Sequence, residues 1–239
     1  MRIRALLLLF AALAFAVSPF LTPGFGGYEP SQFPVPIEEP PVQPAGYAFS
    51  IWGVIYLWLI ASVGYGVWKR AEDAAWDATR RPLLLSLVVG AFWLAVALAS
   101  PIWATVLIWV MLGGALAALL ASPAKDRFLL RGPIGLYAGW LTAASSVSLG
   151  LLAPGWGVPP FGPEGWAIVA LTVGLVIALV MLTKVPSPAY GGAVVWALVG
   201  VVVQNGTSLV GIFAGAAALL VAGYTLVRTR LSRARQTPA

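Results

Sequence analysis

The chain has 239 residues, of which 60% are hydrophobic and 9% charged, whereas soluble domains average about 25% charged residues. Its net charge of +6 and mean hydropathy of +0.92 fit an integral membrane protein. The absence of Cys and His excludes disulfides, thiol chemistry and histidine ligation of a metal or haem. The cations are spread over the gaps between hydrophobic runs, so we expect them to reflect topology and lipid attraction, not nucleic-acid binding.

Hydrophobic runs of about 20 residues, the length needed to cross a hydrocarbon core of roughly 30 Å, follow one another along the chain. They lie at residues 3–20, 47–68, 82–100, 102–122, 132–153, 166–183, 188–204 and 207–227. The seventh run is short, and with the turn at 204–206 it fits either a tilted span or a re-entrant hairpin with the eighth. We favour two spans. The sequence thus predicts an all-α, polytopic membrane helix bundle of about eight transmembrane helices.

All fourteen Lys and Arg residues lie in alternate gaps between these runs or at the two ends of the chain, with Arg4 at the very start of the first run. The other gaps contain no Lys or Arg, and their only charged residues are Glu29, Glu38, Glu39 and Glu164. Because basic loops stay on the cytoplasmic side, the alternation predicts a multi-pass protein with both termini in the cytoplasm. A charge inside a helix would cost about 2.5–3.5 kcal/mol. We expect none there, which argues against an ion-driven pump.

The first run also fits a secretory signal peptide. Arg2 and Arg4 precede an apolar stretch at 5–17, and Ala14-Phe15-Ala16 offers a small-x-small cleavage pattern. Cleavage would leave seven helices and an external N-terminus. We favour a retained helix, because short uncleaved helices overlap signal sequences in length.

A proline-rich segment separates the first two runs. It contains seven prolines, three glutamates and the aromatic residues Phe25, Tyr28 and Phe33. Proline cannot continue a helix or donate to a ladder, so this outer loop is predicted to be extended and polyproline-like. It is either a spacer or a lid folded over the mouth of the helix bundle.

Catalytic groups are not apparent within the runs. The serines have no partner base and the carboxylates lie in loops, so we predict no catalytic residue, no metal site and no enzyme. What remains within the membrane is largely aromatic. Trp52 and Tyr56 are four residues apart, and Tyr137 and Trp140 three apart, so each pair shares a helix face.

Tryptophans at helix ends fit an interfacial belt, but three others are expected nearer mid-membrane. Their indole N–H groups need an acceptor, or their rings line a cavity. These three are Trp58, Trp93 and Trp196.

Three segments carry a family resemblance. They are PAGYAFSIWGVIY at 44–56, LYAGW at 136–140 with Ala144 four residues on, and VWALVG at 195–200. They resemble motifs of the TspO/MBR family, in particular the longer bacterial form called tryptophan-rich sensory proteins. The chain is one residue shorter than the shorter relatives between Phe49 and Trp52, and Ser148 stands where the family has an asparagine. The resemblance covers residues 3 to about 153, and 166–227 is matched only through Trp196.

The resemblance implies a five-helix bundle whose cavity, near the outer loop, binds porphyrins, sterols or similar flat hydrophobic molecules. It assigns ligand contact to Trp52, Tyr56, Tyr137 and Trp140, to which we add Phe49 and Ser148. The loop ending at Pro44 would cover the site. No cofactor is expected apart from such a porphyrin-type ligand, and a metal-free tetrapyrrole suits a chain without His better than haem.

We therefore expect a TspO-like five-helix unit at 1–153 with an outer loop at 21–46. A three-helix extension at 154–228 and a basic cytoplasmic tail at 229–239 would follow. The predicted protein lies in the bacterial cytoplasmic (inner) membrane and binds a flat hydrophobic ligand in an aromatic-lined pocket, with a sensing or regulatory role.

Two alternatives remain open. One is a passive transporter or exporter of a small neutral or lipidic molecule, and the other is a structural membrane partner. The transporter would use polar handles at Gln204, Asn205 and the cluster Ser145, Ser146 and Ser148. Expected partners are membrane lipids and a hydrophobic small molecule. The small residues Gly211 and Gly215 form a smooth helix face that packs within the monomer or, as a second possibility, in a homodimer.

Overall fold

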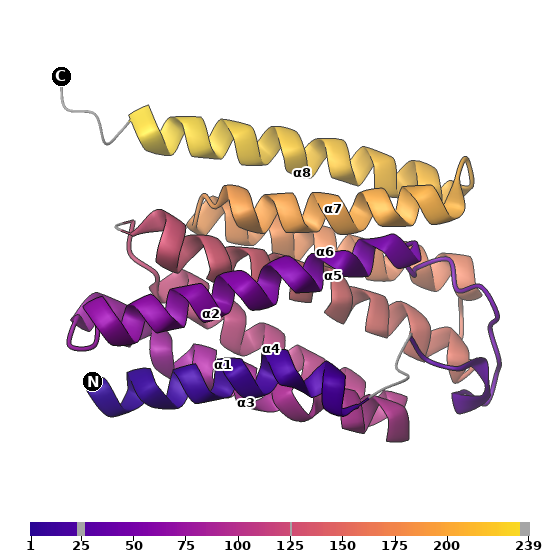
Figure 1. The fold of residues 1–239 in the computed structure, drawn as a ribbon. Helices are drawn as coiled ribbons and strands as arrows, with labels where there is room; N and C mark the ends of the chain where they lie inside the picture. The colour runs from indigo at the N-terminus through magenta and orange to yellow at the C-terminus, as the bar shows by residue number, and fades with distance from the viewer. Residues whose placement is uncertain (23–26, 125, 235–239) are drawn as a thin grey trace. The chain divides into compact units, whose positions relative to one another are not determined.

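The computed structural model describes residues 1–22, 27–124 and 126–234, and the regular elements in these ranges are all helical (Figure 1). Eight helices there are long and apolar enough to cross a membrane. They are α1 (Arg2–Leu21), α2 (Ile51–Lys69), α3 (Ala74–Ala99), α4 (Pro101–Ala121), α5 (Gly132–Gly155), α6 (Pro163–Lys184), α7 (Pro188–Asn205) and α8 (Leu209–Ala234). Short turns lie at η1 (Pro30–Gln32), η2 (Gly46–Ser50) and the π-helical η3 (Arg127–Arg131). The predicted all-α fold with eight spans is confirmed.

The chain forms two compact units. Unit 1 comprises Met1–Glu38 and Ser50–Ile134, and unit 2 comprises Glu39–Phe49 and the described part of Gly135–Ala239. Unit 1 thus holds α1 to α4, η3 and the first three residues of α5, and unit 2 holds the rest of α5 and α6 to α8 with a short piece of the proline-rich loop. The predicted division into 1–153 and 154–228 places the boundary elsewhere and stays a prediction.

Within unit 1, α3 and α4 form an antiparallel hairpin. Ser86 donates to the carbonyl of Met111 at 2.7 Å, and the Trp93 indole donates to that of Ala104 at 2.8 Å. A Cβ at Gly114 would lie 2.7 Å from the carbonyl oxygen of Pro82, so only glycine permits this close approach. The Trp93 bond supplies the acceptor that the sequence required.

Charged residues occupy the first turns of α3, ahead of the predicted span at 82–100, which itself contains no charged residue. The Asp73 carboxylate accepts hydrogen bonds from the backbone N–H groups of Ala75 (2.9 Å) and Trp76 (3.3 Å). This N-cap starts α3 well before the predicted residue 82. The first turns of α3 therefore contain Asp77 and Arg80, and Arg80 is only 2% exposed.

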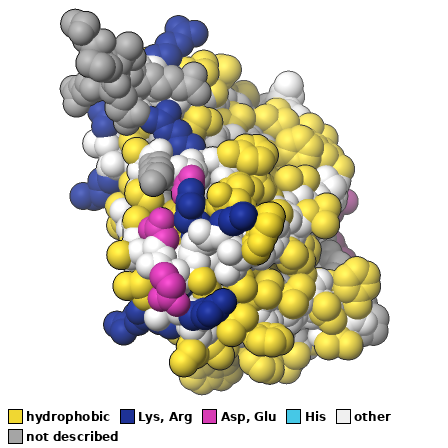
Figure 2. All heavy atoms as spheres, turned by 60° about the vertical axis from the view of Figure 1, so that its left-hand side comes forward, with side chains coloured by type: hydrophobic (Ala, Val, Ile, Leu, Met, Phe, Trp, Pro, Cys, Tyr) yellow, Lys and Arg dark blue, Asp and Glu magenta, His cyan; other side chains and the backbone are white. Residues whose placement is uncertain are grey.

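The buried Arg80 guanidinium is hydrogen-bonded at the end of α2 through both of its terminal nitrogens. It donates to the carbonyl oxygens of Ala71 (2.8 Å) and Arg70 (2.6 Å) and to Asp77 Oδ1 (3.1 Å). Arg4 Nε on α1 also donates to Asp77 Oδ1, at 3.0 Å. The start of α1, the end of α2 and the start of α3 consequently meet at one end of unit 1, as the alternation of basic loops requires. Figure 2 shows cationic and acidic side chains side by side on the face that it brings forward.

Glycines at the helix crossings of unit 2 allow the helix backbones to approach closely. A Cβ at Gly139 on α5 would overlap the carbonyl oxygen of Tyr190 on α7, and one at Gly174 on α6 would lie 2.7 Å from Ser146 Oγ on α5. These positions have no room for a side chain. The backbones therefore approach closely, as small residues allow between membrane helices.

The α7–α8 pair is an antiparallel hairpin of two full helices. Gly191 near the start of α7 lies against Thr225 near the end of α8. Arg228 donates to the carbonyl of Thr183, which places the end of α8 at the end of α6. Both α7 and α8 are long enough to span a membrane, which fits the favoured reading of two spans over a re-entrant hairpin.

The proline-rich loop is divided between the units. In unit 1, Gln32 donates to the carbonyls of Ala97 and Leu98 at 3.2 Å each. In unit 2, Ala45 N–H donates to the carbonyl of Gly200 at 3.0 Å, and Asn205 Nδ2 to that of Pro41 at 2.8 Å. The loop is not extended throughout, because it contains η1 and leads directly into η2. Three predicted parts of the chain lie outside the described residues: loop residues 23–26, Lys125, and the tail from Arg235.

Candidate functional site

Two of the six predicted ligand residues, Trp52 and Tyr56, lie in unit 1 on α2. Their rings stack with centroids 5.4 Å apart and planes 19° apart. Phe15 of α1 meets both rings edge-on, at 5.7 Å from Trp52 and 5.1 Å from Tyr56. Both α2 rings are half-buried and Phe15 is buried. The three side chains form an aromatic ledge, defined here as Phe15, Trp52 and Tyr56.

The other four predicted residues lie in unit 2. Phe49, 38% exposed, meets the buried Trp140 edge-on with ring centroids 5.8 Å apart. Tyr137 is fully buried. Ser148 is buried as well, and its hydroxyl donates to the carbonyl of Ser145 at 2.7 Å. Burial makes Tyr137 and Ser148 part of the packed interior of this unit, and their role as ligand contacts stays a prediction.

The mid-membrane tryptophans differ in how their indole nitrogens are satisfied. Trp196 donates to the carbonyl of Ala48 at 2.8 Å within unit 2. Among the described residues, the buried Trp58 indole nitrogen of unit 1 has no hydrogen-bond partner. Its ring packs over Gly132, where a Cβ would lie 2.6 Å away, and lies 5.2 Å from the Phe128 ring.

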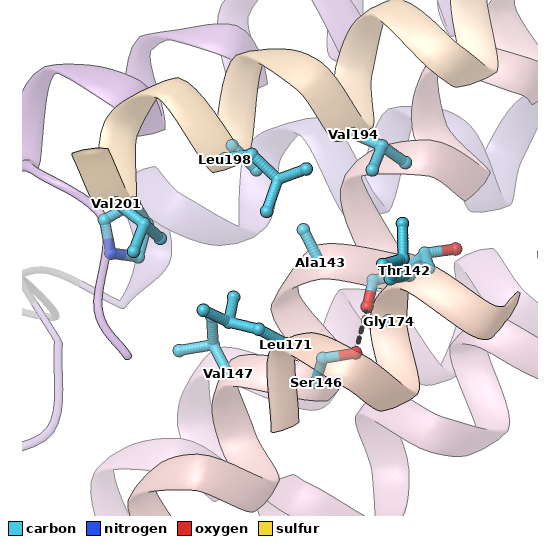
Figure 3. Close-up of a pocket in the computed structure, with 12 residues that line it drawn as sticks. Thr142, Ala143, Ser146, Val147, Leu171, Gly174, Val194, Leu198 and Val201 are labelled. Atoms are coloured by element: carbon cyan, nitrogen blue, oxygen red, sulfur yellow. Dashed lines mark hydrogen bonds between the residues drawn. The ribbon is translucent and has the colours of Figure 1, made fainter. Parts of the chain in front are cut away.

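Sequence reasoning missed a cleft in unit 2 between α5, α6 and α7 (Figure 3). Its cavity volume is about 30 Å³, far below the roughly 300–1,000 Å³ of small-molecule sites. Residues that line it include Ala143, Val147, Leu171, Gly174, Val194 and Leu198. None of the six predicted ligand residues is among the described residues that line this cleft.

The polar groups beside the cleft are satisfied within the protein. Thr142 Oγ1 donates to the carbonyl of Ala138 at 2.9 Å and lies 3.0 Å from the Tyr190 hydroxyl. Ser146 Oγ donates to the carbonyl of Thr142 at 2.9 Å. The sequence signal for this site was the small residues Ala143 and Gly174, which leave space between helices. The transporter alternative instead assigns Ser146 the role of a polar handle.

Comparison with protein families assigns the chain. A family model described as TSPO-like protein matches residues 36–227, most of its length. The chain belongs to the TSPO-like protein family. Comparisons with curated proteins and with solved structures give no significant match.

The extent of this TSPO-like match corrects the predicted extent of the resemblance. The match begins at residue 36, after α1, whereas the predicted resemblance starts at residue 3. It also runs through α6, α7 and most of α8, where the predicted resemblance includes only the segment around Trp196. The matched region therefore includes both α2 of unit 1, with its aromatic residues, and the helices of unit 2 that line the cleft.

Proposed function

We propose that this TSPO-like membrane protein binds a flat hydrophobic molecule, such as a porphyrin, another tetrapyrrole or a sterol, in a sensing or regulatory role. The proposal involves no catalytic step. It also places the protein in a bacterial cytoplasmic membrane with both termini in the cytoplasm, on the basis of the alternating basic loops. The observation that carries the proposal is the aromatic ledge on α2.

The ledge has the geometry that a planar apolar ligand requires. Trp52 and Tyr56 present nearly parallel rings, and the buried Phe15 fixes their position from the neighbouring helix. Because Trp52 and Tyr56 are only half-buried, part of their surface is open to a ligand. Offset stacking on such rings contributes about 0.5–1.5 kcal/mol beyond the area buried.

The aromatic residues of unit 2 are less accessible to a ligand than those of the ledge. Trp140 is 2% exposed and Tyr137 is fully buried. A ligand reaches these rings only after neighbouring side chains move, whereas it reaches the ledge directly. We therefore assign the first contact to Trp52 and Tyr56.

Titration of the purified protein in lipid nanodiscs with metal-free protoporphyrin tests this function. The shift of the porphyrin absorbance band reports binding without depending on which tryptophans remain. We expect Trp52→Leu to weaken binding about threefold to tenfold through the lost stacking surface. Trp103→Leu removes a 63% exposed indole at the start of α4 and serves as the matched control. The absence of saturable binding at micromolar porphyrin, or an equal loss in both variants, contradicts the proposal.

A further inference from the structure

We propose that unit 2 binds the phosphate headgroup of an anionic phospholipid where α6 and α8 end. The site, called here the basic corner, is defined by Lys184 on α6 and by Arg228 and Thr229 on α8. It shares no residue with the aromatic ledge and takes a different ligand. The two proposals therefore stand or fall separately.

Contacts between α6 and α8 place two cations at the basic corner. Arg228 donates to the carbonyl of Thr183, the residue before Lys184 in the last turn of α6. One turn earlier on α8, the Tyr224 hydroxyl lies 2.8 Å from Thr183 Oγ1. The Arg228 guanidinium lies 6.0 Å from the centroid of the Tyr224 ring. These contacts hold Arg228 beside the turn that carries Lys184.

The acidic residues described in unit 2 lie at its opposite end. Glu164 is in the first turn of α6, twenty residues before Lys184 and hence about 30 Å away along the helix. Glu39 lies two residues before Pro41, whose carbonyl accepts from Asn205 at the far end of α7. The two cations of the basic corner therefore have no carboxylate of this unit beside them among the described residues.

The charged end of unit 1 shows the opposite arrangement. There Arg4 and Arg80 pair with Asp77, and Arg70 pairs with Asp126 at 3.0 Å. Both clusters obey the rule that basic residues gather in the cytoplasmic segments. Only the basic corner lacks a counter-ion within its own unit among the described residues. An external anion is the partner that this charge pattern fits.

Two polar atoms of the basic corner also lack a partner. Arg228 Nε and Thr229 Oγ1 are covered by the protein and make no hydrogen bond among the described residues. Leaving such groups unpaired is costly. Both side chains are only half-buried, so rotation of the guanidinium brings Nε to an incoming oxygen. A phosphate presents several charged oxygens and pairs well with a guanidinium fork.

The start of α7 lies at the same corner. Thr229 follows Thr225 by four residues, so both face the same side of α8. Thr225 packs against Gly191 near the start of α7, where a Cβ on the glycine would overlap its hydroxyl. Helix α7 begins at Pro188, and the positive end of its dipole adds to the attraction for an anion. The basic corner is thus bounded by three helix ends.

The position of the basic corner favours a phospholipid over a soluble anion. It lies at the ends of helices that are long and apolar enough to cross a membrane, and lipid headgroups surround such ends. Exposed apolar side chains lie on the adjoining turns of α6 and α8, at Val180, Leu226 and Val227. They offer contact to the acyl chains of a lipid whose phosphate lies at the basic corner.

Native mass spectrometry of the full chain in a neutral detergent tests the assignment. It measures the dissociation constant of the first bound lipid, for phosphatidylglycerol and for phosphatidylcholine with identical acyl chains. We expect phosphatidylglycerol to bind about fivefold more tightly, as one unshared cation near a headgroup provides. Equal affinities for the two lipids would overturn the proposal.

Charge-removing variants separate this site from general attraction. Arg228→Gln and Lys184→Gln are each expected to lower the preference for phosphatidylglycerol to about twofold or less. Lys184 is exposed, so its variant tests the site even if Arg228→Gln loosens the contact with α6. Arg230→Gln is the matched control, because this exposed arginine lies on another face of α8 and is expected to keep the preference.

Two further outcomes would contradict the proposal. An equal loss of preference in Arg230→Gln and in the two site variants would show attraction to the basic helix end in general. Displacement of phosphatidylglycerol by millimolar inorganic phosphate would show that the basic corner binds a free anion and not a lipid.

Discussion

At the scale of single residues, Arg80 is the clearest departure from what the sequence indicates. The hydrophobic pattern placed it in a loop, because cations are rare inside membrane helices. The structure buries it at the start of α3 with acceptors from Arg70, Ala71 and Asp77. Two of these acceptors are backbone carbonyls just beyond α2, which an arginine commonly satisfies at a helix end. Such partners are distant in the pattern and appear only once the helices meet.

Removal of this guanidinium is expected to destabilise unit 1 strongly. Arg80→Met leaves Asp77 with one fewer partner and two carbonyls unsatisfied, and breaking a buried pair typically costs about 3–5 kcal/mol. The neighbouring Arg81 is exposed, so Arg81→Met is expected to change stability by less than about 0.5 kcal/mol. Reversible unfolding in mixed micelles measures both. Similar losses of unfolding free energy in the two variants would show that the hydrogen bonds of Arg80 do not stabilise unit 1.

The aromatic residues show where sequence reasoning succeeds. The four-residue spacing of Trp52 and Tyr56 correctly predicts a shared face, because helix geometry alone sets it. The expected need of Trp58, Trp93 and Trp196 for an indole acceptor is met for Trp93 and Trp196, whereas the Trp58 indole nitrogen has none among the described residues. The acceptors themselves, the carbonyls of Ala104 and Ala48, were not predictable. The Ala48 carbonyl lies far from Trp196 along the chain, and no local rule identifies it.

At the scale of elements, hydropathy located the eight spans but not all of their ends. Helix α3 begins early because Asp73 caps it, and Pro82 is tolerated inside the helix. A proline normally marks a first turn, which explains the misplaced start. Helix α8 likewise continues to Ala234, beyond the predicted end of the eighth run at residue 227. Polar helical turns outside the membrane carry no hydropathy signal, so the pattern misses them.

The contact between α7 and α8 offers a test with adjacent glycines. A Cβ at Gly191 would overlap the Thr225 hydroxyl, whereas a Cβ at Gly192 meets nothing within 4 Å. Gly191→Ala is therefore expected to cost about 1–3 kcal/mol of unfolding free energy through overpacking. Gly192→Ala is expected to be neutral or slightly stabilising, because alanine favours helix. Thermal unfolding of the two variants decides, and a loss confined to Gly192→Ala would contradict the described packing.

At the scale of the whole molecule, the chain forms two units that no sequence motif marked. The loop segment Glu39–Phe49 belongs to unit 2, although the residues on both sides of it belong to unit 1. The segment contacts unit 2 through the hydrogen bonds Ala45–Gly200 and Pro41–Asn205. Each bond joins residues more than 150 positions apart in the chain. Composition identified this loop as unusual, but it could not say which helices the loop contacts. The cleft that Pro44 helps to line was missed for the same reason.

The central claim is that the chain crosses the membrane eight times with its basic loops in the cytoplasm. The chain contains no Cys, so single cysteines can be introduced into a silent background. Ala124, between α4 and η3, and Phe161, between α5 and α6, are both exposed loop positions. A membrane-impermeant maleimide applied to intact cells is expected to label Phe161→Cys, and to label Ala124→Cys only after permeabilisation. Labelling of Ala124→Cys in intact cells, with Phe161→Cys protected, would contradict the topology on which the account depends.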